Sequence, residues 1–231
     1  MRLSLLTEII APYRIPVFNA LARRPEIDLH VIFLAETDPT QRHWPVYQSE
    51  IEFSYQVLPS WRRRIGAHHV LLNRGTAAGL RRAAPEVILC GGYNYPASWT
   101  AWRWAHRDQL PFLLWVESTA RDLRNRRRVV EWAKERFIRG CAGFVVPGQS
   151  SRKYLRSFGV DEKAIFTAPN AVDNDLFAAH AEQARREADR RRSELGLAEH
   201  FFLFVGRLIE SKGIFDLLDA YGKLAPDLQR E

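Results

Sequence analysis

Two basic side chains near the end of the sequence have the types and the spacing that bind a diphosphate. Arg207 follows an apolar run that predicts a strand over 201–205, and Lys212 stands at the start of a helix predicted over 214–224. In open α/β sheets ligands bind beside the carboxyl ends of the strands, where helix N-termini attract anions. A guanidinium fork and an ammonium at this edge, next to Gly206, would clamp a diphosphate. The alternative is an ordinary loop whose two basic side chains are solvated.

The elements that would position these side chains alternate along the chain. Apolar runs of about five residues predict strands, and the longer stretches between them predict helices. The predicted strands are 3–10, 29–35, 53–58, 87–90, 112–116 and 144–146, and the predicted helices are 17–24, 73–83, 96–107, 129–139 and 153–158. Asn73 is the expected cap of the second helix. This alternation predicts an α/β fold with a Rossmann-like, doubly wound parallel sheet.

The regular alternation of apolar runs and helix-like stretches ends after residue 160. We expect an N-terminal Rossmann-like domain over 1–160, an interdomain linker over 161–198, and the first strand–helix unit of an incomplete second Rossmann-like domain over 199–231. The run 178–194 is polar and helix-prone, which is typical of a solvated helix or one that bridges domains. A single strand–helix unit cannot bury both of its faces, so the second domain is expected to be truncated.

The positive charge of the chain is concentrated in two stretches. The 231 residues carry Lys+Arg 34 against Asp+Glu 27, a net charge of +7. Segments 121–139 and 185–192 contribute +5 and +3, so the remainder of the chain is nearly neutral. The first stretch interleaves arginines with Trp132, Phe137 and Ile138, which suits an anionic membrane surface; the alternative is a solvated outer helix face. No RNA- or DNA-binding motif accompanies the charge, so we expect no nucleic-acid partner.

Cysteine and histidine usage narrows the chemistry further. The two cysteines cannot form a disulfide framework, which favours a reducing, cytoplasmic location. The seven histidines show no metal-ligand spacing with cysteines or carboxylates, and we expect no metal. The longest apolar runs are far shorter than the roughly 20 residues of a membrane span. A membrane partner would therefore be met peripherally, on the inner membrane face.

Three ordered motifs over residues 144–224 resemble glycosyltransferase family 4, whose members have the GT-B fold. The segment VGRLIESKGIFDLLDAYGKL, 205–224, is similar to the start of the family's C-terminal domain: a strand, Gly-Arg, a linker, Lys-Gly, and a helix with paired leucines. The segment 146–177 resembles its interdomain region, with a Ser-containing turn, a helix ending in Gly-Val, and Pro-Asn-x-Val-Asp before Phe. In the N-terminal half only the strand–helix pattern and Tyr13-Arg14-Ile15-Pro16 match.

The resemblance implies a donor site built on the first pair of residues. Arg207 and Lys212 match the basic pair with which the family binds the donor diphosphate and stabilises the leaving nucleoside diphosphate. Members usually transfer a sugar from a nucleotide sugar with retention and without a metal. The implied activity is transfer of a hexose-type sugar from a UDP- or GDP-sugar to a cell-surface polysaccharide or lipid-linked glycan. The family's Glu-x7-Glu pair is not in this sequence, so we expect little transfer by this chain alone.

Residues at the other strand ends would face the acceptor in such a fold. Glu117 follows the strand 112–116, where it could orient or deprotonate an acceptor hydroxyl, and it is the third expected catalytic residue. Its alternative is a helix cap or a partner of Arg121. Tyr93 and Asn94 follow the strand 87–90 and either contact substrate or simply form a turn.

Two departures from the family pattern bear on the phosphate contacts. The loop after the first strand lacks the glycines that many relatives carry, so Arg14 could supply a side-chain contact instead; its alternative is a surface salt bridge. Ala171 replaces the family's glycine in the Pro-Asn-x-Val-Asp turn, which disfavours a positive φ there.

Two rival functions remain open from the sequence. One is a non-catalytic module that binds a membrane or a partner through the basic stretches. The other is a sugar-nucleotide epimerase of the same fold, which would need acid–base residues that the sequence does not contain.

Overall fold

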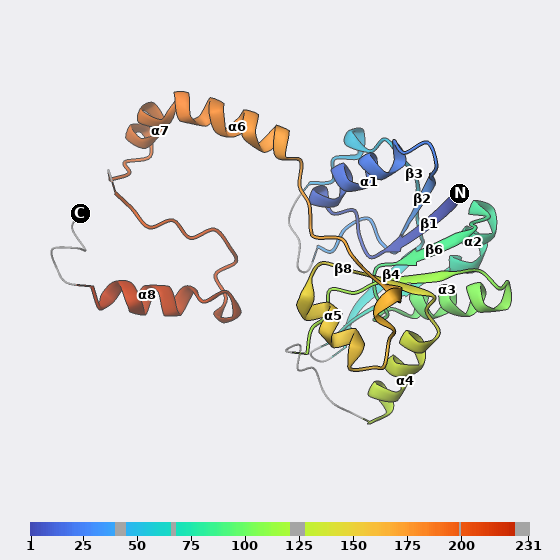
Figure 1. The fold of residues 1–231 in the computed structure, drawn as a ribbon. Helices are drawn as coiled ribbons and strands as arrows, with labels where there is room; N and C mark the ends of the chain where they lie inside the picture. The colour runs from blue at the N-terminus through green and yellow to red at the C-terminus, as the bar shows by residue number, and fades with distance from the viewer. Residues whose placement is uncertain (40–44, 66–67, 121–127, 199, 225–231) are drawn as a thin grey trace. The chain divides into compact units, whose positions relative to one another are not determined.

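The computed structural model describes residues 1–39, 45–65, 68–120, 128–198 and 200–224. The chain divides into two compact units, Met1–Asp173 and Asn174–Glu231. Figure 1 shows the first unit as a sheet flanked by helices and the second as separate helices joined by extended chain.

A seven-stranded sheet in which every pair of neighbours is parallel forms the centre of the first unit. Its order is β3-β2-β1-β6-β7-β8-β9. The strands are β1 (Arg2–Thr7), β2 (Asp28–Phe33), β3 (Ser54–Val57), β6 (Val87–Cys90), β7 (Phe112–Trp115), β8 (Gly143–Val146) and β9 (Ile165–Thr167). The predicted doubly wound, Rossmann-like sheet is confirmed.

The direction of winding reverses at β1. From β1 the chain adds β2 and β3 on one side, and then returns to place β6 on the other side. Leu6 of β1 is therefore in register with both Ile32 of β2 and Cys90 of β6. Ligands of open α/β sheets bind at such a reversal, beyond the carboxyl ends of the strands. The carboxyl ends of β1 and β6 mark the topological switch point of this unit.

Helices cover the two faces of the sheet unequally. They are α1 (Ile15–Ala22), α2 (Thr76–Ala83), α3 (Pro96–Arg107), α4 (Arg128–Arg139) and α5 (Gln149–Arg156). Side chains alternate between the faces of a strand, so Leu5 and Leu6 of β1 enter different cores. Leu5 joins the core that α1 covers, and Leu6 joins the larger core formed with α2, α3, α4 and α5.

An antiparallel hairpin was not predicted. Its strands are β4 (Ser60–Ile65) and β5 (His68–Asn73). Helix α2 consequently begins after the hairpin, and the expectation that Asn73 caps it was wrong. Gly75 stands at the cap with a φ of 84°. Asn73 is the last residue of β5, and its side-chain amide donates to the Leu34 carbonyl at 2.5 Å.

Helix α4 contacts the core through its C-terminal half. Phe137 and Ile138 are buried, and the Phe137 ring packs edge-to-face against Trp99 of α3 with centroids 4.8 Å apart. Val130 lies two turns before Phe137 on the same face of the helix, and it is half exposed. Burial is therefore complete only at the end of α4 that packs against α3.

The first unit extends beyond residue 160. Strand β9 pairs with β8 as the edge strand of the sheet, although its residues fall in the segment expected to be a linker. Arg152 of α5 binds this strand by donating to the Ile165 carbonyl at 3.1 Å and to the Thr167 hydroxyl at 2.8 Å. Gly159 has a φ of 77°, as a glycine that ends a helix often does. Residues 161–173 therefore belong to the sheet domain.

The second unit consists of helices α6 (Asn174–Arg186), α7 (Ala188–Glu194) and α8 (Ile214–Gly222). Arginines and glutamates of α6 and α7 pair along the helix surface, as Arg191 and Glu187 do at 2.7 Å. The strand expected over 201–205 is absent, and most of these apolar side chains are exposed. A strand needs a hydrogen-bonding neighbour, and the described part of this unit contains none.

Candidate functional site

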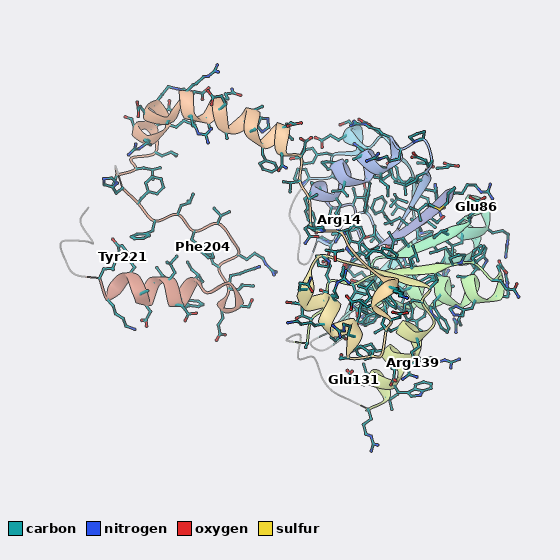
Figure 2. All side chains as sticks on the ribbon, viewed as in Figure 1. Arg14, Glu86, Glu131, Arg139, Phe204 and Tyr221 are labelled. Atoms are coloured by element: carbon teal, nitrogen blue, oxygen red, sulfur yellow. The ribbon has the colours of Figure 1, made fainter. Side chains whose placement is uncertain are left out.

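The structure brings together two of the predicted site residues, Arg14 and Glu117. Arg14 belongs to a short 3-10 helix after β1, and Glu117 lies two residues beyond the end of β7. The Arg14 guanidinium donates to the Glu117 carboxylate at 2.5 Å. Figure 2 shows Arg14 at the opposite end of the sheet from Glu86, which precedes β6 at its amino end. The pair therefore lies at the carboxyl edge of the sheet, where a ligand is expected.

An aromatic side chain supports the guanidinium of this pair. Arg14 lies over the ring of Trp115, the last residue of β7, at 4.6 Å from the ring centroid. Such cation–π contacts orient a guanidinium as well as stabilise it. The side chain of Arg14 is 20% exposed and that of Glu117 49% exposed. Arg14 is thus held by the Trp115 ring, and half of the Glu117 side chain remains accessible.

The other predicted acceptor residues have different environments. Tyr93 is half-buried: its hydroxyl lies 3.3 Å from that of Tyr154, and its ring packs against Phe137. Its carbonyl accepts from the indole of Trp99 at 3.0 Å. Asn94 is exposed at the carboxyl edge. Tyr93 therefore contributes to packing under the edge, and Asn94 is the one of the two that is available to a substrate.

The donor-side residues lie in the second unit. Arg207 and Lys212 are both exposed, and Lys212 ends a 3-10 turn over Glu210–Lys212. Gly213 follows with a φ of 71° and begins α8. At Gly206 a Cβ atom would lie 3.0 Å from the Phe204 ring, so a side chain there would require that ring to shift. The local order is thus an arginine, a tight turn, a lysine and a helix N-terminus.

A polar cluster at the carboxyl edge was missed by the sequence analysis. Arg62 of β4 contacts the Asp38 carboxylate at 2.8 Å and the Glu8 carboxylate at 3.4 Å. Burial, together with the neighbouring Glu8 carboxylate, raises the pKa of Tyr95 well above its ordinary value. The cluster was missed because the hairpin was not predicted, and Arg62 meets Glu8 only because β4 places it there. The one sign available in the sequence was that Glu8 interrupts the apolar run predicted as the strand 3–10.

Among the residues that the structure describes, no group of three or more histidine, cysteine, aspartate or glutamate side chains is arranged to hold a metal ion. Over the same residues, no helix combines the length and apolar character needed to cross a bilayer.

Solved structures share this fold. HepE from Anabaena, in complex with UDP-glucose, superposes with a TM-score of 0.62 at 15% identity, covering 98% of this chain and 58% of HepE. UDP-GlcNAc 2-epimerase from Neisseria meningitidis, bound to UDP-GlcNAc, superposes with a TM-score of 0.52 at 15% identity, covering 84% and 52% of the two chains. Among curated proteins, no sequence match was found. The fold is the Rossmann-like α/β architecture of GT-B proteins.

The sequence match is more specific than the fold. Residues 17–176 match Glycosyltransferase Family 4. The chain therefore belongs to glycosyltransferase family 4. It spans 58% of the length of HepE.

Proposed function

We propose that the protein acts in the transfer of a sugar from a UDP- or GDP-sugar to a glycan acceptor. Membership of glycosyltransferase family 4 is the observation that carries this proposal. Arg207 and Lys212 bind the donor diphosphate and stabilise the charge that develops on the departing nucleoside diphosphate. That stabilisation requires no metal, and transfer with retention at the anomeric carbon is part of the proposal.

The acceptor binds at the carboxyl edge of the sheet in the first unit. Glu117 is held by Arg14 at 2.5 Å and half exposed, so it accepts a hydrogen bond from an incoming hydroxyl. The ion pair fixes the direction of the carboxylate, which favours orientation of the acceptor as its main contribution. Asn94 is exposed at the same edge. A polysaccharide or a lipid-linked glycan is the proposed acceptor class.

The donor half of the proposal is tested by titrating the chain with UDP and with GDP. Two charge-assisted hydrogen bonds contribute roughly 3–6 kcal/mol, which corresponds to dissociation constants from several millimolar down to tens of micromolar. We expect shifts of the backbone amide signals over 206–213 in a two-dimensional NMR spectrum, and their loss in the double variant Arg207→Ala, Lys212→Ala.

A matched control is available on the same unit. Lys223 is exposed and pairs with Asp219 at 2.9 Å. Lys223→Ala removes one positive charge without touching the proposed clamp, so it should bind as the wild type does. Equal binding by the double variant, or the absence of shifts with both nucleotides, would contradict the donor site.

The proposed acceptor class makes an anionic membrane the proposed peripheral partner, on the cytoplasmic face. Helix α4 exposes Val129 and Trp132, with 63% of Trp132 accessible, and carries exposed Arg128 and Arg136. Its glutamates already have partners within the helix: Lys134 contacts Glu131 at 2.8 Å. Figure 2 shows Glu131 and Arg139 along this helix. Residues 121–127, the other part of the basic stretch, lie outside the described residues.

Vesicle co-sedimentation tests this partner. We expect binding to vesicles of phosphatidylglycerol and phosphatidylcholine, weaker binding to pure phosphatidylcholine, and a reduction in the variant Trp132→Ala. Trp61, half exposed on the hairpin, provides the control variant Trp61→Ala. Binding that is independent of lipid charge and unchanged in Trp132→Ala would contradict the membrane partner. The donor proposal would not be affected by that result.

A further inference from the structure

The cluster of Glu8, Asp38, Arg62 and Tyr95 lies at the switch point of the sheet. Glu8 directly follows β1, and Tyr95 caps α3 in the connection after β6. Strands β1 and β6 are paired neighbours from which the chain winds in opposite directions. Tyr95 and Glu8 are close enough to interact, so they lie on the two sides of the position where open α/β sheets bind ligands.

The members of the cluster differ in exposure. The side chains of Asp38 and Arg62 are 6% and 14% exposed, whereas that of Glu8 is 35% exposed. Arg62 thus lies between two carboxylates, and Glu8 has the most exposed of these three side chains. Two carboxylates and one guanidinium leave the cluster with a formal charge of −1. A carboxylate with this surplus charge retains capacity to accept further hydrogen bonds.

The connection between β6 and Tyr95 has open space at one residue. Gly92 lies in the connection between β6 and Tyr95, with a φ of 140°. A Cβ atom built at Gly92 would meet nothing within 4 Å. The connection that leads from β6 to Tyr95 is therefore not packed against other side chains at Gly92.

We propose that Glu8 binds a hydroxyl group of the saccharide acceptor at the switch point. The inference rests on the proposed function and adds a second acceptor contact, on a different strand end from Glu117. A carboxylate is the natural partner of a sugar hydroxyl because the charge strengthens the hydrogen bond. Tyr95 and Arg62 are positioning residues: they hold Glu8 in one direction, and Asp38 holds Arg62.

A carboxylate that is already held in position lets the site discriminate between sugars by their hydroxyl groups. An acceptor that lacks the matching hydroxyl leaves a desolvated carboxylate without a partner, which is far costlier than a lost apolar contact. The hairpin therefore contributes to acceptor choice through Arg62, although it is not part of the parallel sheet.

The test is saturation-transfer NMR of the chain with four probes at about 5 mM, a concentration suited to weak sugar binding. The probes are the methyl glycosides of glucose, galactose, mannose and N-acetylglucosamine. We expect at least one to bind, with an affinity loss of about tenfold or more in Glu8→Gln and a smaller loss in Tyr95→Phe. The control is Glu36→Gln, since Glu36 is an exposed carboxylate near the end of β2 that bonds Gln48 at 2.6 Å.

A second variant separates recognition from folding. Glu8→Asp keeps the charge beside Arg62 and withdraws the carboxylate by one methylene, so it should melt as the wild type does and still lose saccharide binding. Unchanged binding in Glu8→Gln and Glu8→Asp overturns the inference. Absence of binding by all four glycosides overturns it as well, and leaves the donor proposal intact when UDP or GDP still shifts the amides over 206–213. Failure of both titrations overturns the proposed function together with the inference.

Discussion

Substitution of Gly140 by alanine tests the packing that holds α4 on the sheet domain. Gly140 follows the last turn of α4 and faces the indole of Trp102 in α3. A Cβ atom at this position would lie 2.5 Å from Cζ2 of Trp102 and 2.8 Å from its Nε1. These distances are far below van der Waals contact, so either the indole or the end of α4 must move.

The indole has little freedom to move. Its ring is stacked on Phe137 with centroids 5.8 Å apart and lies 4.0 Å from the ring of His106. Overpacking of this kind costs about 1–3 kcal/mol. The reduced freedom of the unfolded chain offsets about 0.4–1 kcal/mol of that cost. We expect Gly140→Ala to lower the free energy of unfolding by about 1–2 kcal/mol and the melting temperature by roughly 2–8 °C.

Urea unfolding followed by tryptophan fluorescence measures this effect. The variant Trp102→Phe removes the atoms that the new Cβ would meet, so Gly140→Ala should cost less in that background. The two substitutions should couple by roughly 1 kcal/mol in a double-mutant cycle. Gly222→Ala is the control, because nothing lies within 4 Å of a Cβ there. Additive effects, or a stabilised Gly140→Ala variant, would refute the reasoning.

Three further predictions concern the first unit. Burial raises the pKa of the Cys90 thiol to about 11, so iodoacetamide at pH 8 should alkylate it in the unfolded protein and hardly in the native one, as mass spectrometry would show. Burial lowers the pKa of His30, so the unfolded state binds more protons between the folded and unfolded pKa values. Stability should therefore be complete above the ordinary histidine pKa and fall as the pH drops below it, and His30→Gln should flatten this dependence in urea titrations between pH 5 and 8. Arg152→Ala removes two hydrogen bonds to β9, should cost about 1–3 kcal/mol, and should speed hydrogen exchange of the β9 amides; unchanged exchange would contradict that role.

The strands and helices of the sheet domain were predictable because their signals are local. Val87–Cys90 and Pro96–Arg107 have the predicted bounds, since an apolar run before glycines and a proline at a helix start are decisive by themselves. The segment 201–205 has a similar apolar composition, but the strand predicted there does not form. A strand also requires a neighbour to accept its hydrogen bonds, and composition does not supply one.

In the candidate site, too, single residues were predictable from local sequence, whereas the contacts between them were not. Arg14 and Glu117 were predictable singly, because each follows an apolar strand, but their ion pair joins positions 103 residues apart. Glu8 and Arg62 are 54 residues apart and meet only because the hairpin returns Arg62 to the carboxyl edge. Hairpin strand β4, SWRRRI, has too little apolar alternation to be recognised as a strand.

The unrecognised hairpin has a consequence for acceptor choice. A parallel sheet places side chains at its carboxyl edge through the loops that follow its strands, and one of these loops carries the proposed acceptor contact Glu117. The hairpin places Arg62 there from outside the parallel sheet. A change in the hairpin can therefore redirect Glu8 without altering any strand of that sheet. The variant Arg62→Lys keeps the charge but loses the fork that contacts both Glu8 and Asp38. It should therefore weaken saccharide binding while leaving nucleotide binding by the second unit unchanged.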